Sequence, residues 1–135
     1  MKKWILIALG IFIALNMITY GSDLPAQDAK MIEAAGVPIY PDATFATGNR
    51  DVGYRFATSK SPAEVRQWYR EKLTGWSLME EYGAWILYKG KQGARMSEIM
   101  TKNQVAIQKN DNLPQWHSLK KDMTTEIVIM IPKTE

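Results

Sequence analysis

The chain has 135 residues, 46% of them hydrophobic, no cysteine and a formal net charge of +3. Two of its 17 lysines and arginines, Lys2 and Lys3, fall within the first 21 residues, so the 114 residues that follow carry 15 bases against 14 acids. This near-neutral balance argues against nucleic acid as a partner. The lack of cysteine excludes both a disulfide-stabilised domain and lipid attachment at a cysteine.

An export signal is predicted at the N-terminus. Two lysines precede a largely apolar run over residues 4–18. A run of about 15 apolar residues is typical of a signal peptide, whereas a spanning helix needs about 20. We therefore expect residues 1–21 to direct export to the periplasm or the cell exterior. Two alternatives stay open: cleavage of this segment, or its retention as an inner-membrane anchor, with membrane contact only through residues 4–20.

A short linker or helix is expected over residues 22–36. Asp23 or Asp28 is suited to capping a helix over residues 29–35, since a carboxylate accepts hydrogen bonds from first-turn amides. Gly36 then provides the left-handed position that commonly ends a helix.

A β-hairpin is predicted next, with strands over residues 43–47 and 51–58. Gly48-Asn49 lies between them and is a candidate two-residue turn. Alternation in the second strand predicts three inward-facing side chains, namely Val52, Tyr54 and Phe56.

The clearest helix signal begins at Ser61. Ser61 and Glu64 form a capping box with Pro62 at the first helical position. Gly75 is expected to end the helix. One apolar face follows at helical spacing, formed by Val65, Trp68, Tyr69 and Leu73. The charged residues between them, Arg66, Arg70 and Lys72, are interpreted as the solvated face.

The second half of the chain reads as strands with short helical interruptions. Strands are predicted over residues 76–81, 84–89, 104–109 and 125–131, with short helices over 97–101 and 113–119. The order ββαββ(α)ββ with short connections predicts an α+β fold. We expect an antiparallel sheet of five to six strands with one main amphipathic helix on one face, forming a single domain over residues 37–135.

A family resemblance rests on two groups of residues: Ile39–Ala43, and Ser61–Val65 followed by Trp68, Tyr69, Leu73 and Gly75-Trp76. This pattern resembles small exported bacterial domains of unknown function, often lipoproteins, with a "YPgA … s-x-eev-x-x-fY-x-x-L-x-x-GW" signature. The resemblance covers roughly residues 36–89 and runs more loosely to 131. It implies the fold and export, and it assigns no activity to named residues.

An aromatic surface is the candidate binding site. Both faces of the strand over residues 84–88 are apolar, and one helix covers only one of them. Exposed aromatic side chains there suit a protein or glycan of the cell envelope. The predicted surface consists of Trp85, Tyr88, Trp116 and Tyr82.

No catalytic, cofactor or metal site is predicted. His117 is the only histidine, and zinc sites draw on several histidine or cysteine ligands. Ser118-Leu119-Lys120-Lys121 matches S-x-x-K by coincidence, because the chain is too short for that enzyme fold. Asn110-Asp111-Asn112 lacks the further oxygen ligands of a calcium loop.

These observations predict an exported, non-enzymatic binding or accessory domain of the cell envelope. One alternative is a membrane-anchored subunit of an envelope complex. Another is a small carboxylate-dependent hydrolase using Glu80 and Glu81. That pair is disfavoured because adjacent residues of a strand point to opposite faces.

Overall fold

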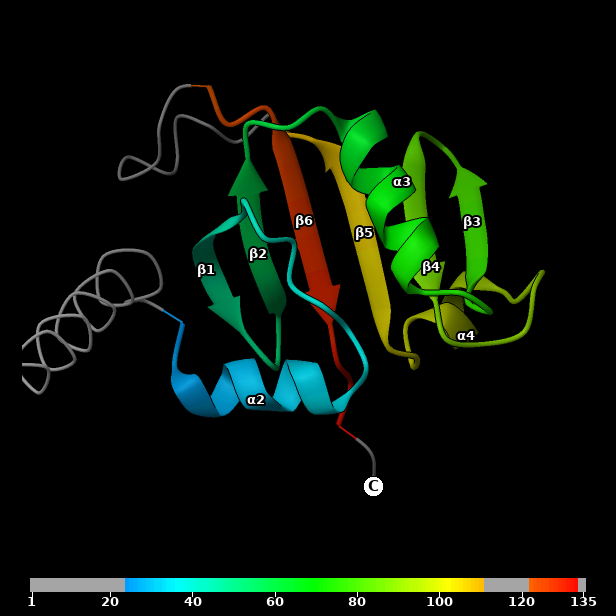
Figure 1. Cartoon of the computed structure of the whole chain (residues 1–135). Helices are drawn as coiled ribbons and strands as arrows, with labels where there is room; N and C mark the ends of the chain where they lie inside the picture. Colours follow the sequence, from blue (N-terminus) through cyan, green and yellow to red (C-terminus); the bar gives the residue numbers. More distant parts are fainter. Residues whose placement is uncertain (1–23, 111–121, 134–135) are drawn as a thin grey trace, which may run out of the picture.

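The computed structural model describes residues 24–110 and 122–133 (Figure 1). Three helices and six strands lie within these ranges. The helices are α2 (Ala26–Ala34), α3 (Pro62–Lys72) and α4 (Met96–Ile99). The strands are β1 (Thr44–Asn49), β2 (Gly53–Thr58), β3 (Ser77–Glu81), β4 (Ala84–Tyr88), β5 (Gln104–Lys109) and β6 (Thr125–Met130).

The strands form one antiparallel sheet in the order β1-β2-β6-β5-β4-β3. The last strand, β6, lies between β2 and β5, so the chain through α3 crosses to the far edge before it folds back. One row of paired residues runs across all six strands: Gly48, Tyr54, Ile129, Val105, Leu87 and Leu78. This architecture confirms the predicted α+β class with an antiparallel sheet.

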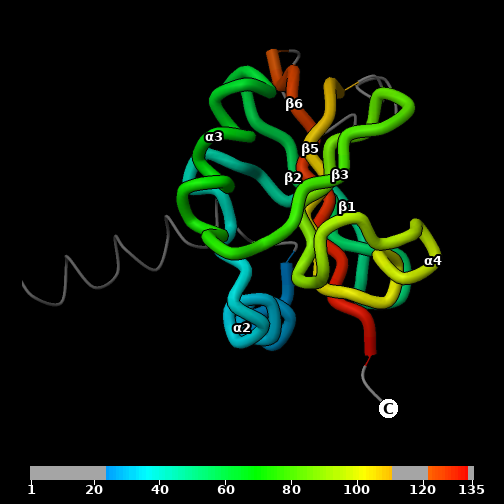
Figure 2. The backbone as a smooth tube through the Cα atoms, turned by 90° about the vertical axis from the view of Figure 1, so that its right-hand side faces the viewer, coloured from blue at the N-terminus to red at the C-terminus, as the bar shows by residue number. Residues whose placement is uncertain are grey.

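Helices cover both faces of the sheet. Helices α2 and α3 lie on one side and α4 on the other (Figure 2). The larger core lies under α2 and α3 and includes Ile32, Tyr54, Phe56, Val65, Tyr69, Val105, Ile107, Ile127 and Ile129. A smaller cluster beneath α4 consists of Ile86, Tyr88 and Ile99. The apolar second face of β4 is thus covered by α4.

The capping signal at the start of α3 is confirmed. The Glu64 amide donates a 3.2 Å hydrogen bond to Ser61 Oγ, and the Ser61 hydroxyl donates to Glu64 Oε1 at 3.2 Å. Pro62 occupies the first helical position, where no intrahelical amide donor is required. Gly75 follows the helix with φ +85°, a conformation that favours glycine.

Helix α2 differs from its predicted form. It begins at Ala26 after Pro25, with no side-chain cap, so Asp28 lies within the first turn and does not cap a helix over residues 29–35. Asp23, the other predicted cap, lies outside the described residues. Asp28 instead accepts a 3.0 Å hydrogen bond from the Tyr54 hydroxyl. Because Ile32 is fully buried in the larger core, α2 is part of the packed domain and not a linker before it.

The turn of the first hairpin lies two residues later than predicted. Asn49 pairs with Gly53, so the connection is residues 50–52 and not Gly48-Asn49. Asn49 Oδ1 accepts hydrogen bonds from the Asp51 and Val52 amides, an Asx turn that outweighs the two-residue alternative. Val52 is therefore exposed in the turn, whereas Tyr54 and Phe56 face the core as predicted.

Tyr69 fixes the extended segment that precedes β1. Its hydroxyl donates to the Pro38 carbonyl at 2.9 Å and accepts from the Tyr40 amide at 3.2 Å. Burial raises the pKa of Tyr69 above its usual value. The hydroxyl therefore bonds to two backbone groups of the segment from inside the core.

A side-chain amide covers part of the outer edge of β3. Gln92 Nε2 donates to the Leu78 carbonyl at 2.9 Å, and Gln92 Oε1 accepts from the Leu78 amide at 3.1 Å. The loop that carries Gln92 is held by the Tyr88 hydroxyl, which donates to the Lys91 carbonyl at 2.7 Å. Gln92 thus takes the place that one residue of a seventh strand would occupy.

The predicted signal segment (1–21) and the predicted helix over 113–119 lie outside the described residues. In the part of the chain that the structure describes, no helix combines the length and apolar character that crossing a membrane requires.

Candidate functional site

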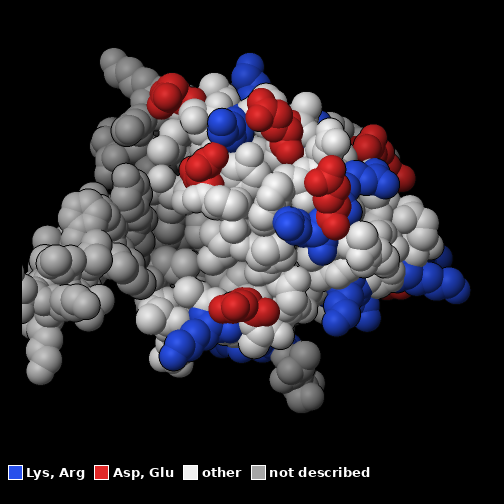
Figure 3. Space-filling view, in the orientation of Figure 1, with Lys and Arg blue, Asp and Glu red and all other residues white. Residues whose placement is uncertain are grey.

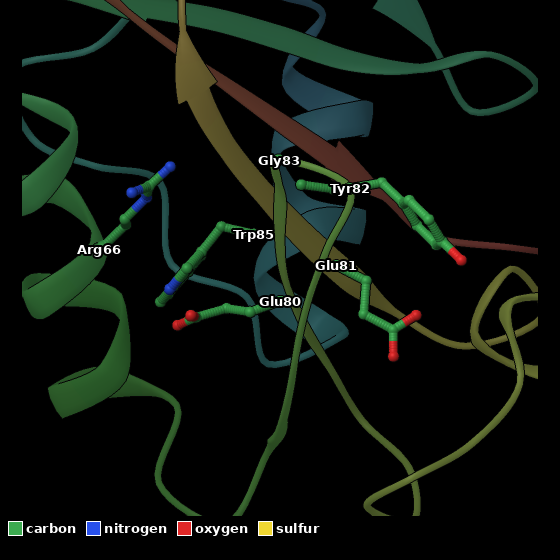
Figure 4. Close-up of a pocket in the computed structure, with 7 residues that line it drawn as sticks. Arg66, Glu80, Glu81, Tyr82, Gly83 and Trp85 are labelled. Carbon is green, nitrogen blue, oxygen red and sulfur yellow. The ribbon is translucent and has the colours of Figure 1, made fainter.

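A pocket of about 280 Å³ lies between α3 and the β3–β4 hairpin. The hairpin tip provides most of its lining and α3 provides one residue (Figure 4). The lining residues are Arg66, Glu80, Glu81, Tyr82, Gly83, Ala84 and Trp85. The volume is slightly below the roughly 300–1,000 Å³ of drug-sized sites, so the pocket suits one sugar ring or a similarly small group.

The hairpin tip is a two-residue turn with an unusual first residue. Tyr82 has φ 54° and Gly83 has φ 78°, and two successive left-handed residues are typical of a type I′ turn. Asparagine and glycine are preferred in such turns, because a Cβ in the left-handed region costs about 1–2 kcal/mol. Tyr82 is the only described non-glycine residue with positive φ, and its side chain is fully exposed. The fold thus tolerates local strain to present a tyrosine at this position.

The two carboxylates of the hairpin lie on opposite sides of the strand. Glu80 pairs with Trp85 across β3 and β4, which places both side chains on the face of the sheet below α3. Figure 4 shows Glu80 and Trp85 pointing toward Arg66, whereas Glu81 points the other way, together with Tyr82. Glu80 and Glu81 therefore do not face one another across the pocket, as expected from strand geometry.

Arg66 forms the helical wall of the pocket. Its Nη2 donates to the Ile107 carbonyl at 3.2 Å, and its Cζ lies 5.6 Å from the centroid of the Trp85 ring. Within the described residues, the Arg66 Nε–H is buried and has no hydrogen-bond partner. A buried unpaired donor is costly, because it has lost its bonds to water. Because this atom is closed to solvent, its missing hydrogen bond is a local cost of packing α3 on the sheet and not a contact that a ligand in the pocket can reach.

The pocket combines three complementary chemical groups. The Arg66 guanidinium is a permanent cation with several N–H donors, and the Glu80 carboxylate accepts hydrogen bonds. The Trp85 indole adds an apolar surface beside them. No ion pair within 4.0 Å joins Arg66 to Glu80 among the contacts of the described residues, so both groups retain bonding capacity. A ligand that both accepts and donates hydrogen bonds fits this arrangement best.

The structure does not bring the predicted aromatic residues together on one surface. Trp85 is 7% exposed and belongs to the larger core, whereas Tyr88 is 1% exposed and belongs to the smaller cluster on the opposite face. Neither ring contributes to an exposed patch, because α3 covers one side of β4 and α4 covers the other. Tyr82 alone of the described set is exposed, and Trp116 lies outside the described residues.

Arg66 was interpreted from the sequence as part of a solvated face. Figure 3 shows acidic and basic side chains interspersed over α3, and Arg70 and Lys72 are exposed as expected. Arg66 differs because it lies three residues before Tyr69 and seven before Leu73, which places it at the margin of the buried face. That spacing is the signal by which the sequence could have identified it.

The other sequence candidates fall mostly outside the described residues, including His117, Ser118-Lys121 and Asp111-Asn112. Asn110 is described and buried, and its Nδ2 donates to the Met123 carbonyl at 3.0 Å. Among the described residues, no group of three or more histidine, cysteine, aspartate or glutamate side chains is placed to hold a metal ion.

Comparisons of the chain with protein families, with curated proteins and with solved structures find no match. The resemblance to small exported bacterial domains therefore stays a prediction.

Proposed function

We propose that this protein is an exported, non-enzymatic binding domain of the cell envelope, and that it binds an envelope glycan in the pocket between α3 and the β3–β4 hairpin. The proposed exported location rests on the N-terminal sequence pattern. The observation that carries the proposed site is the convergence of the Arg66 guanidinium, the Glu80 carboxylate and Trp85 on one pocket.

A glycan fits the pocket better than a simple anion. The pocket holds one cation, Arg66, next to the carboxylate of Glu80, so a purely anionic ligand is attracted by one group and repelled by the other. Sugar hydroxyls both accept from a guanidinium and donate to a carboxylate. The part of Trp85 that lines the pocket adds an apolar contact at its margin. The volume of about 280 Å³ accommodates one such ring.

Tyr82 supports a ligand larger than one sugar. Its exposed ring lies on the side of the hairpin away from Arg66 (Figure 4). A single sugar ring beside Arg66 lies on the other side of the hairpin from the Tyr82 ring, whereas a glycan chain that passes over the hairpin tip contacts both sides. The strained position of Tyr82 is then explained by contact with this chain.

The test is an NMR titration of the full chain in detergent micelles with two soluble probes, a muropeptide from peptidoglycan and the core oligosaccharide of lipopolysaccharide. We expect one probe to shift the Trp85 indole N–H and the Arg66 Nε–H resonances. Arg66→Gln abolishes the shift of the Trp85 indole N–H, and the matched variant Arg70→Gln, one helical turn away and exposed, retains it. Failure of both probes to shift either resonance contradicts the proposal.

A further inference from the structure

A second surface, distant from the pocket, combines positive charge with exposed apolar side chains. It lies on the connection between β4 and β5, which includes α4. We call it the basic end surface, and it consists of Lys89, Lys91, Arg95, Met96, Met100 and Lys102.

The charge of this connection is strongly unbalanced. Its four lysines and arginines are all exposed, and Glu98 is the single acid between residues 89 and 103. The ion pairs of the described residues join Arg55 to Glu126 and Lys133 to Asp51, so none neutralises a cation of the basic end surface. This cluster contributes four of the 15 bases in residues 22–135, which are near neutral only when the cluster is included.

The two methionines give the surface an apolar centre. Met96 is 47% exposed and Met100 is 45% exposed, and they lie one helical turn apart, at the first residue of α4 and at its C-cap. Ile99 is fully buried against Ile86 and Tyr88 and holds α4 on the sheet. Exposed apolar side chains within a basic rim are typical of surfaces that contact anionic lipid bilayers.

The position of the surface in the fold indicates the same partner. Tyr88, Gln104 and Met130 are aligned across neighbouring strands, so the β4–β5 connection leaves the sheet at the end where β6 finishes. Figure 1 shows that α2, which follows the N-terminal segment, crosses this same end. The pocket lies at the opposite end, since Glu81 pairs with Ala84 beside the hairpin tip.

We propose that the basic end surface docks on an anionic membrane surface and directs the glycan pocket away from the bilayer. This inference rests on the exported location proposed above. The chain would then contact the membrane in two ways. The apolar segment over residues 4–20, which precedes α2, provides the first contact, and the basic end surface provides a second, electrostatic one. A short apolar segment combined with a basic patch is a common pair of signals for stable membrane attachment.

The test uses fluorescence from single cysteines in the full chain, which contains no native cysteine. Ser97→Cys on α4 and Ser59→Cys at the opposite end of the sheet are both exposed and carry the same environment-sensitive dye. We expect a blue shift at position 97, and none at position 59, with phosphatidylglycerol vesicles. Phosphatidylcholine vesicles give no shift at either position.

Variants that remove positive charge test whether the basic residues cause the docking. Lys91→Gln with Arg95→Gln weakens docking about 25-fold, since each base near an anionic surface contributes about fivefold. Lys60→Gln with Lys109→Gln, an equal loss of charge at the other end, leaves docking within about twofold. Raising the salt concentration to about 1 M also removes the shift, because the screening length falls to about 3 Å.

Three results overturn the proposal: no shift at position 97 with phosphatidylglycerol, equal shifts with both lipids, or equal shifts at positions 97 and 59. If the basic end surface mediates self-association instead, the dye at position 97 shifts without vesicles, and the shift grows with protein concentration. Failure of docking leaves the NMR titration of the pocket unaffected, so the two proposals fail separately.

Discussion

The guanidinium of Arg66 lies over the indole of Trp85, with Cζ 5.6 Å from the ring centroid, and joins α3 to β4 at the mouth of the pocket. A hydrogen bond from Arg66 to the Ile107 carbonyl fixes the same side chain on β5. Arg66 is therefore held in place before any ligand arrives. A donor that is already positioned loses little conformational entropy when it binds.

The left-handed conformation of Tyr82 leads us to expect that a variant with a more stable fold binds the glycan more weakly. Tyr82→Asn is expected to stabilise the fold by about 0.5–1 kcal/mol, because asparagine tolerates the left-handed region better than tyrosine does. Urea unfolding measures this gain. The same variant is expected to weaken glycan binding, and Tyr82→Val is expected to destabilise the fold. A loss of stability in Tyr82→Asn contradicts the strain assigned to the turn.

The amide of Gln92 predicts an effect on self-association. Gln92→Ala removes two hydrogen bonds to Leu78 and is expected to cost about 1 kcal/mol of stability. It also exposes the Leu78 amide and carbonyl at the edge of β3, so dimers formed by edge pairing are expected at high concentration. Sedimentation velocity detects them. Gln67→Ala, which removes an exposed amide from α3, provides the control and should stay monomeric.

The ion pair between the partly exposed Arg55 and the buried Glu126 leads us to expect strongly non-additive stability changes. Glu126 is fully buried, and its Oε1 accepts from Arg55 Nη1 at 2.8 Å and from Gln108 at 2.6 Å, while Oε2 has no partner among the described residues. Arg55→Met leaves this charge unpaired and should cost about 2–3 kcal/mol. Adding Glu126→Leu should recover most of that loss in urea unfolding. Additive effects of the two changes would show that the pair is not coupled.

Tyr54 predicts a loss of stability in alkaline solution. Burial, together with the hydrogen bond to Asp28, raises the pKa of Tyr54 from 10.0 to about 12. The unfolded chain releases this proton first, so the contribution is complete below pH 10 and declines as the pH rises toward 12. Tyr54→Phe should make the decline shallower, with a remaining slope from Tyr69, whose pKa is also raised. Urea unfolding between pH 9 and pH 12 measures both slopes, and identical slopes contradict the assignment.

Local signals predicted most of the elements. The Ser61 capping box located the start of α3, and alternation located β5 at Gln104–Lys109. The predicted turn at Gly48-Asn49 is wrong because the Asn49 side chain organises a turn over residues 50–52. Helix α2 starts at Ala26 without a side-chain cap, so capping signals in the sequence predict its start three residues too late.

The pocket was not predictable from local pattern. It depends on β3 and β4 lying at the edge of the sheet under α3, an order that the sequence does not encode in any short segment. The sequence predicts Trp85 on an exposed surface, whereas it is buried because Arg66 and α3 cover it. Glu80 was considered only as a partner for Glu81. Strand alternation excluded that pair and also placed Glu80 on the face of Trp85.

The most direct test of the glycan site is isothermal titration of the full chain with the muropeptide or the core oligosaccharide, whichever shifts the Trp85 resonance, in parallel with Arg66→Gln and Arg70→Gln. Loss of a hydrogen bond to a charged donor costs about 1.5–3 kcal/mol, so Arg66→Gln should raise Kd at least tenfold. Arg70→Gln should change it less than twofold. Equal affinity of the two variants for that probe would contradict the assignment of Arg66 as the ligand-binding residue.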